Sequence, residues 1–79
     1  MVKLIVFNMD AFLQVVNQCN GSVYLLKKDG RRENINKDYD TQEYLRRKHQ
    51  VNQDYSRLSL EIPDSKDYMS IVSYNMGNL

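Results

Sequence analysis

Few residues of this 79-residue chain are of the types that perform covalent chemistry. There is one histidine, His49, in the run RRKHQ, and one cysteine, Cys19, on an apolar helical stripe. No Cys, Asp or Glu stands at a ligand spacing from His49, and a single cysteine excludes an internal disulfide and a multi-cysteine zinc site. We therefore expect His49 to be a solvated residue at a helix end and Cys19 to be a small core residue.

Three carboxylates, Asp38, Asp40 and Glu43, crowd the expected start of a second helix. The central glycine and final glutamate of an EF-hand loop are missing, so we interpret these carboxylates as complementing the helix dipole. Phosphate-binding loops, dinucleotide fingerprints and a Ser-His-Asp order are also missing. The sequence thus predicts a protein that is not an enzyme and that uses no metal or cofactor.

Basic residues gather around an expected hairpin tip and in the second helix. A formal net charge of +1 predicts no long-range attraction to nucleic acid or to a membrane. We favour an edge strand kept soluble by its charges, with a weak nucleic-acid contact as the alternative. The residues of this basic surface are Lys27, Lys28, Arg31, Arg32, Arg46 and Arg47.

The stretch VFNMDAFLQ, residues 6–14, predicts a strand that runs directly into a helix. Free backbone N–H groups and the positive end of the helix dipole make such a junction an anion site. Asn8 is suited to cap the helix. Asp10 would repel an anion, however, and the stretch contains no His, Ser, Lys or Arg.

The first elements follow from the pattern of apolar residues. A strand is expected over Val2–Phe7 and a helix over Met9–Asn20, with Gly21 as a left-handed cap. Ser22–Lys28 and a polar, short edge strand, 31–35, form a hairpin. A two-residue turn at Asp29–Gly30 joins them. The apolar stripe of the first helix consists of Phe12, Val15, Val16 and Cys19.

The second half of the chain contains a weaker helix, a clear strand and a last helix. Asp40 or Thr41 could cap the middle helix, with Tyr44 and Leu45 as its apolar anchors, and the segment 52–54 follows as a loop.

Ser56–Ile62 alternates like a half-buried strand, which Pro63 ends. Asp64 or Ser65 then caps the last helix, and Asp67 completes an approximate capping box. Its predicted stripe is Tyr68, Ile71, Val72 and Met76.

The order β-α-β-β-α-β-α predicts an α+β fold in which one antiparallel sheet of four strands is covered on one face by three helices. We expect a single domain over residues 1–79. The start MVKLIVF is too short for a signal peptide, and no apolar run is long enough to span a bilayer. These features predict a cytoplasmic protein with no membrane partner.

The run CNGSVYLLKKDGRREN, a polar helix, SRLSLEI and then PDSKDYMSIVSYNMGNL resembles HPr, the small phosphocarrier of the bacterial sugar phosphotransferase system. The resemblance covers roughly Phe12 to Leu79. The family has a phenylalanine–asparagine pair where Cys19–Asn20 stand, and its lysine–glycine hairpin is similar to Asp29–Gly30. The resemblance implies an HPr-like open-faced β-sandwich and a bacterial, cytoplasmic protein.

The functional motif of HPr is missing from the sequence. The family carries its phosphoryl group on the histidine of a Gly-Leu-His-Ala-Arg-Pro segment where its first strand meets its first helix. Here the chain reads VFNMDAF, with no match to the histidine or the arginine. The resemblance therefore implies a degenerate member that has lost phosphocarrier activity. The residues at this place are Asn8, Met9, Asp10 and Phe12.

Such a member would bind or regulate another protein through the surface around its first and middle helices. A further alternative is a structural subunit that dimerises through its edge strand or its tyrosines. HPr also has a regulatory serine at the start of its middle helix. Here that region reads NKDYDTQEY, and Thr41 is the nearby hydroxyl, either a regulatory position or a helix cap.

Overall fold

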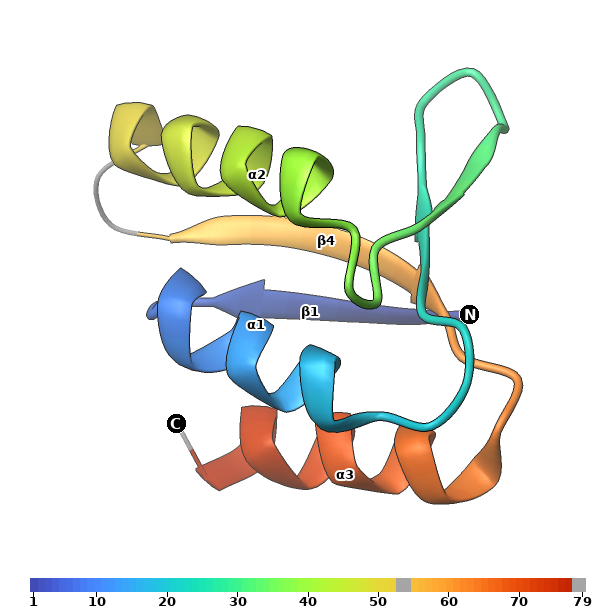
Figure 1. Ribbon diagram of the computed structural model, residues 1–79. Coiled ribbons are helices and arrows are strands. Elements are labelled where there is room, and N and C mark those ends of the chain that lie inside the picture. Colours follow the sequence, from blue (N-terminus) through green and yellow to red (C-terminus); the bar gives the residue numbers. More distant parts are fainter. Residues whose placement is uncertain (53–54, 78–79) are drawn as a thin grey trace.

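The computed structural model describes residues 1–52 and 55–77 of the chain and confirms the predicted α+β fold (Figure 1). Gln53 and Asp54, in the predicted loop, lie outside the described residues. The elements are β1 (Val2–Val6), α1 (Met9–Gln18), β2 (Tyr24–Leu26), β3 (Arg32–Asn34), α2 (Tyr39–Asn52), β4 (Ser56–Glu61) and α3 (Ser65–Gly77).

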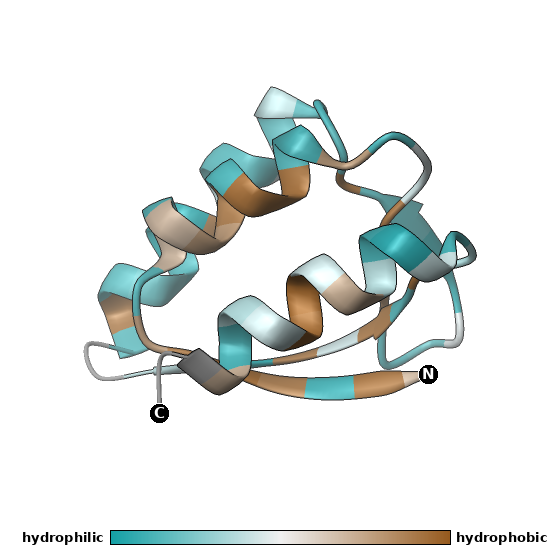
Figure 2. Cartoon of the chain, turned by 90° about the horizontal axis from the view of Figure 1, so that it is seen from below, coloured by the Kyte–Doolittle hydropathy of each residue, from teal (hydrophilic) through white to brown (hydrophobic). Residues whose placement is uncertain are grey.

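The strands form one antiparallel sheet in the order β1-β4-β2-β3. The pairing of β1 with β4 is long and runs from Val2↔Leu60 to Val6↔Ser56. The pairing of β2 with β4 is short and consists of Tyr24↔Glu61 and Leu25↔Leu60. All three helices lie on one face of the sheet, as an HPr-like open-faced sandwich requires, and β3 is an edge strand as predicted (Figure 2).

The hydrophobic core lies between the sheet and the helices, and α1 supplies its largest share. Phe12 and Val16 are fully buried, which confirms the predicted stripe of α1. The longer helix α2 contributes one buried apolar side chain, Leu45. The core consists of Leu4, Val6, Met9, Phe12, Leu13, Val16, Cys19, Val23, Ile35, Leu45, Leu60, Ile62 and Ile71.

Capping of α1 follows the prediction at its start and departs from it at its end. The Asn8 side chain accepts a hydrogen bond from the Ala11 backbone N–H at 3.1 Å. At the other end Gly21 is not left-handed, so that prediction is wrong. The carboxylate of Asp67 accepts the N–H groups of Asn20, at 3.1 Å, and Gly21, at 2.8 Å, and holds the chain in a different conformation.

Asp67 therefore does not complete a capping box at the start of α3. Asp64 caps this helix by accepting the N–H groups of Lys66, at 2.8 Å, and Asp67, at 3.0 Å. The predicted stripe of α3 is correct at the buried Ile71 but wrong at Tyr68 and Met76, which are exposed. Because Asp67 bonds to the loop after α1, it connects the two helices that cover β1.

The β2–β3 hairpin has a three-residue loop instead of the predicted two-residue turn. The Gly30 N–H donates to the Lys27 carbonyl at 3.0 Å, and the Lys27 N–H donates to the Arg31 carbonyl at 2.9 Å. Gly30, at φ +88°, has a left-handed conformation, whereas Asp29 does not. The Asp29 carboxylate accepts the Arg31 N–H at 3.0 Å instead, and Gly30 alone provides the left-handed residue of this turn-and-bulge loop.

Helix α2 begins earlier than predicted and buries different residues. Asp38 caps it by accepting the Thr41 N–H at 3.3 Å, so neither Asp40 nor Thr41 is the cap. Tyr44 is 58% exposed and is not an anchor. The second buried side chain of α2, besides Leu45, is Gln42, which is fully buried.

Candidate functional site

The junction of β1 and α1 is a small hollow, of about 250 Å³, that α2 helps to form. The chain around residue 8 supplies one wall, and α2 supplies Arg46, His49 and Gln50. The sequence pattern places no histidine or arginine here, yet the fold brings one of each to the start of α1. The lining residues are Phe7, Asn8, Met9, Asp10, Arg46, His49 and Gln50.

Asp10 is paired with a cation of the neighbouring helix. The Arg46 Nε lies 2.7 Å from the Asp10 Oδ1, and a second guanidinium nitrogen of Arg46 lies 3.8 Å from Glu43 on its own helix. A carboxylate in the first turn also interacts favourably with the α1 dipole. Asp10 thus provides the negative charge that an anion would otherwise bring to this helix end.

Both ring nitrogens of His49 have hydrogen-bond partners. The Nε2 lies 3.2 Å from the Phe7 carbonyl oxygen, and the Nδ1 lies 2.7 Å from the Ser56 hydroxyl. A carbonyl can only accept, so in the neutral ring Nε2 donates and Nδ1 accepts from Ser56. His49 lies in the last turn of α2, as predicted, but it is half-buried and connects α2 to the end of β1 and the start of β4.

Two of the four residues predicted for this site are not on the surface. Met9 and Phe12 are 4% and 0% exposed and belong to the core. Asn8 and Asp10 are exposed, but Asn8 is used as the cap of α1 and Asp10 is paired with Arg46. The polar groups at the junction therefore satisfy one another.

The helical spacing of α2 could have revealed this arrangement. Gln42, Leu45, Arg46 and His49 stand at i, i+3, i+4 and i+7, which places them on one face of a helix. Sequence reasoning overlooked this stripe because three of its four members are polar. Its first member is bound to α1 by reciprocal amide hydrogen bonds between Gln42 and Asn17, at 2.7 and 3.2 Å.

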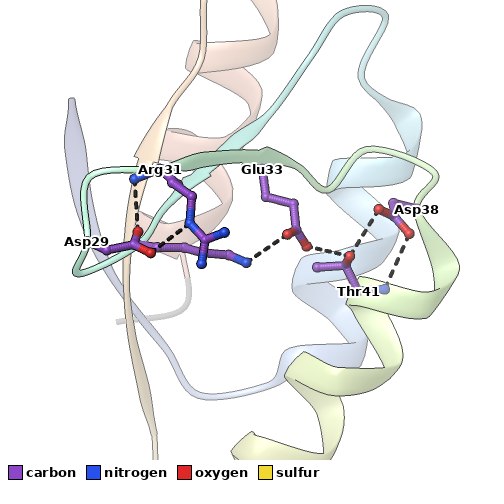
Figure 3. Close-up of polar contacts among 6 residues, drawn as sticks. Asp29, Arg31, Glu33, Asp38 and Thr41 are labelled. Carbon is purple, nitrogen blue, oxygen red and sulfur yellow. Dashed lines mark hydrogen bonds and ion pairs between the residues drawn. The ribbon is translucent and has the colours of Figure 1, made fainter.

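Thr41 lies between two carboxylates (Figure 3). Its hydroxyl oxygen is 2.6 Å from the Glu33 Oε1 and 3.0 Å from the Asp38 Oδ2, and Lys27 pairs with Glu33 at 2.8 Å. The hydrogen bonds from Lys27 and then Thr41 lower the pKa of Glu33. A phosphoryl group on Thr41 would meet two negative charges at this distance, so the structure gives no support to a regulatory site here.

Five of the six residues of the predicted basic surface have carboxylate partners. Besides Lys27 and Arg46, Arg32 pairs with Glu61 at 3.2 Å and Arg31 with Asp29 at 2.6 Å. Arg47 lies 3.6 Å from Glu43. Lys28 has no ion pair within the described part of the chain. The charge of the hairpin is thus largely balanced locally.

Cys19 is buried, as predicted, and its Sγ lies 3.5 Å from the Val15 carbonyl oxygen. Burial, followed by the negative charge of Asp67, raises the pKa of the thiol to about 11. The reactive form of cysteine is the thiolate. Cys19 is therefore a protonated, inert core residue at neutral pH.

Among residues 1–52 and 55–77, no three His, Cys, Asp or Glu side chains are grouped so that they could hold a metal ion. No helix in these residues is long and apolar enough to cross a membrane.

Comparison with known proteins identifies no relative of this chain. The chain matches no model of a protein family, no curated protein and no solved structure.

Proposed function

We propose that this protein is a non-catalytic, HPr-like module that binds or regulates another protein and has lost phosphocarrier chemistry. The fold has the element order and single covered sheet face that the resemblance implies. Phosphoryl transfer of the HPr type needs a nucleophilic imidazole beside an open helix start.

The observation that carries this proposal is the occupied start of α1. Asp10 and Arg46 neutralise each other at 2.7 Å, where a phosphoryl group would need the cation. The one histidine at the hollow, His49, has hydrogen-bond partners on both ring nitrogens, so it offers no free lone pair to an incoming phosphorus atom. The junction is arranged to hold β1, α1 and α2 together.

Exposed apolar side chains on α2 and beside the junction support a protein-binding surface. On α2, Tyr39, Tyr44 and Val51 are each more than half exposed, and Phe7 at the end of β1 is 47% exposed. Aromatic residues are enriched in the cores of protein interfaces. The contact surface we propose is therefore α2 with the adjoining end of β1.

A nucleic-acid-binding function is the second candidate, and the ion pairs of the hairpin residues Lys27, Arg31 and Arg32 disfavour it. Nucleic-acid affinity depends on cations that are available to neutralise phosphates. Here Arg31, Arg32 and Lys27 each face a carboxylate within 3.2 Å. Binding of a generic oligonucleotide at about 50 mM salt would favour this candidate.

The loss of phosphocarrier chemistry can be tested by mass spectrometry. The protein is incubated with phosphoenolpyruvate and the first enzyme of the sugar phosphotransferase system, with an authentic HPr as the positive control. We expect its mass to stay unchanged while the control gains one phosphoryl group. Phosphorylation of His49 would overturn the proposal.

Protein binding can be tested with a photo-crosslinking amino acid in place of Tyr44 on α2. The control places the same amino acid at Lys66, an exposed position on α3. We expect a discrete crosslinked partner from position 44 and none from position 66. Identical products from the two positions, or none from either, would contradict a partner surface on α2.

A further inference from the structure

A second hollow, of about 530 Å³, lies where α2 passes over the sheet. Its apolar part is made by Leu25 and Leu58, which are half-buried, and by the buried Leu45 and Met9. From α2, Tyr44, Lys48 and Asn52 line it at a spacing of one and two helical turns. We call this hollow the α2 groove.

The groove exists because β2 and β4 separate. Their pairing ends at Leu25↔Leu60, and from there the β2–β3 hairpin leaves β4 (Figure 1). On its other side β4 stays paired with β1 down to Val6↔Ser56. Residues Ser56–Ser59 of β4 therefore have a strand partner on one side only within the described chain.

A strand with one free side is a template for another strand. Alternate residues of a β-strand direct their N–H and C=O groups to the same side, so part of the backbone of 56–59 faces the groove. At about 3.4 Å per residue this stretch of four residues is about 14 Å long, enough to pair with a short extended segment. Side chains of such a segment alternate, and every second one would meet the apolar part of the groove.

The groove has a positive rim with no carboxylate among its described lining residues. Lys27, Lys28, Lys48 and Arg57 all line it. Lys27 pairs with Glu33, but the salt bridges of residues 1–52 and 55–77 include none for the other three. Lys3, Lys37 and Lys66 also have no salt bridge in these residues, but they do not line the groove. Three cations without a salt bridge thus line one hollow, beside the free side of β4.

From these observations we propose that the α2 groove binds an extended acidic segment of a partner protein, which pairs with residues 56–59 of β4. Apolar side chains of the segment enter between Leu25, Leu45 and Leu58, and its carboxylates meet Lys28, Lys48 and Arg57. This inference deepens the proposed protein-binding function and rests on it. It specifies the chemistry of the partner and the mode of recognition.

The test measures binding of a fluorescein-labelled nine-residue peptide of alternating glutamate and valine to the full chain by fluorescence anisotropy. The same peptide with lysine in place of glutamate is the charge control. A third peptide is the acidic one with N-methyl groups on alternate residues, which removes backbone donors and keeps the side chains. We expect binding of the first peptide only.

Two matched double variants locate the site. Exchanging both groove lysines, Lys28→Glu with Lys48→Glu, should weaken binding by roughly tenfold, since each lost cation–carboxylate contact contributes modestly and each new charge repels. Lys3→Glu with Lys66→Glu makes the same charge change at exposed lysines outside the groove and should alter affinity by less than about twofold. Circular dichroism confirms that both variants are folded.

Several outcomes would overturn the inference. Equal weakening by the two double variants would mean general electrostatic attraction, and unchanged binding of the N-methylated peptide would exclude strand pairing. A groove filled by a second copy would appear as a concentration-dependent dimer in sedimentation, with no peptide binding. If the peptides fail while position 44 still crosslinks to one partner, this inference fails and the proposed function stands.

Discussion

Two parts of this molecule are held together by different forces. Helices α1 and α3 pack on β1 and β4 through apolar side chains, among them Phe12, Leu13 and Ile71, which are fully buried. Helix α2 and the β2–β3 hairpin, in contrast, depend on polar contacts. Gln42 bonds to Asn17, and Thr41 to Glu33. We call these the apolar part and the polar part.

This difference explains where the groove lies. Apolar packing brings surfaces together until no space remains, because each gap loses contacts and leaves apolar area in water. Hydrogen bonds fix α2 at a few points and leave room between them. The groove accordingly lies where α2 and the β2–β3 hairpin of the polar part meet β4, between Leu25 and Leu58.

The largest expected difference concerns two aromatic residues, one from each part. Phe12→Ala should destabilise the fold by about 3–5 kcal/mol, because it leaves a cavity in the core. Tyr44→Ala, on the exposed face of α2, should cost about 0.5 kcal/mol or less. Urea denaturation followed by circular dichroism measures both. Similar costs for the two variants would contradict the division into an apolar and a polar part.

The next effect concerns the amide pair that joins the two parts. Gln42→Ala should cost about 1–3 kcal/mol, because the Asn17 amide and the Ile35 carbonyl lose their buried partner. A double-mutant cycle with Asn17→Ala should give a coupling energy of about 0.5 kcal/mol or more. Strictly additive costs would mean that the two amides do not depend on each other.

Two glycines allow a smaller, matched comparison. Gly30→Ala should cost about 1 kcal/mol, because φ is +88° there and a Cβ disfavours that region. Gly21→Ala should change stability by less than about 0.5 kcal/mol, since its φ is not positive and the nearest atom beyond its chain neighbours, the Asp67 Oδ2, would lie 3.4 Å from the new Cβ. Urea denaturation measures both costs. A larger cost for Gly21→Ala than for Gly30→Ala would support the left-handed cap that the sequence predicts at Gly21.

The smallest effect is a pH dependence in the polar part. The hydrogen bonds from Lys27 and Thr41 lower the pKa of Glu33 below its ordinary value of 4.5. Its contribution to stability is therefore present above pH 4.5 and is lost as the pH falls through the lowered pKa. Glu33→Gln should remove that loss, so the stabilities of wild type and variant should converge in acid. A constant difference at all pH values would contradict this.

The sequence was informative where a residue acts on its own neighbours. The stripe of α1, the Asn8 cap and the alternation of β4 depend on positions a few residues apart, and all were predicted correctly. The capping box predicted for Asp67 is wrong because its carboxylate accepts hydrogen bonds from Asn20 and Gly21, which are far away in the sequence. The same is true of the junction, since Arg46 and His49 reach it from another helix. Local patterns contain no information on such long-range hydrogen bonds.

The register of β1 with β4 has a consequence for folding. Val2 pairs with Leu60, so the best-paired strands of the sheet are also the furthest apart along the chain. Pairing of this kind cannot form early, because a long loop must close first, and such topologies fold slowly. During synthesis, β1 leaves the ribosome before β4 and stays unpaired until β4 follows. Until then its apolar residues Leu4 and Val6 would be exposed to other chains.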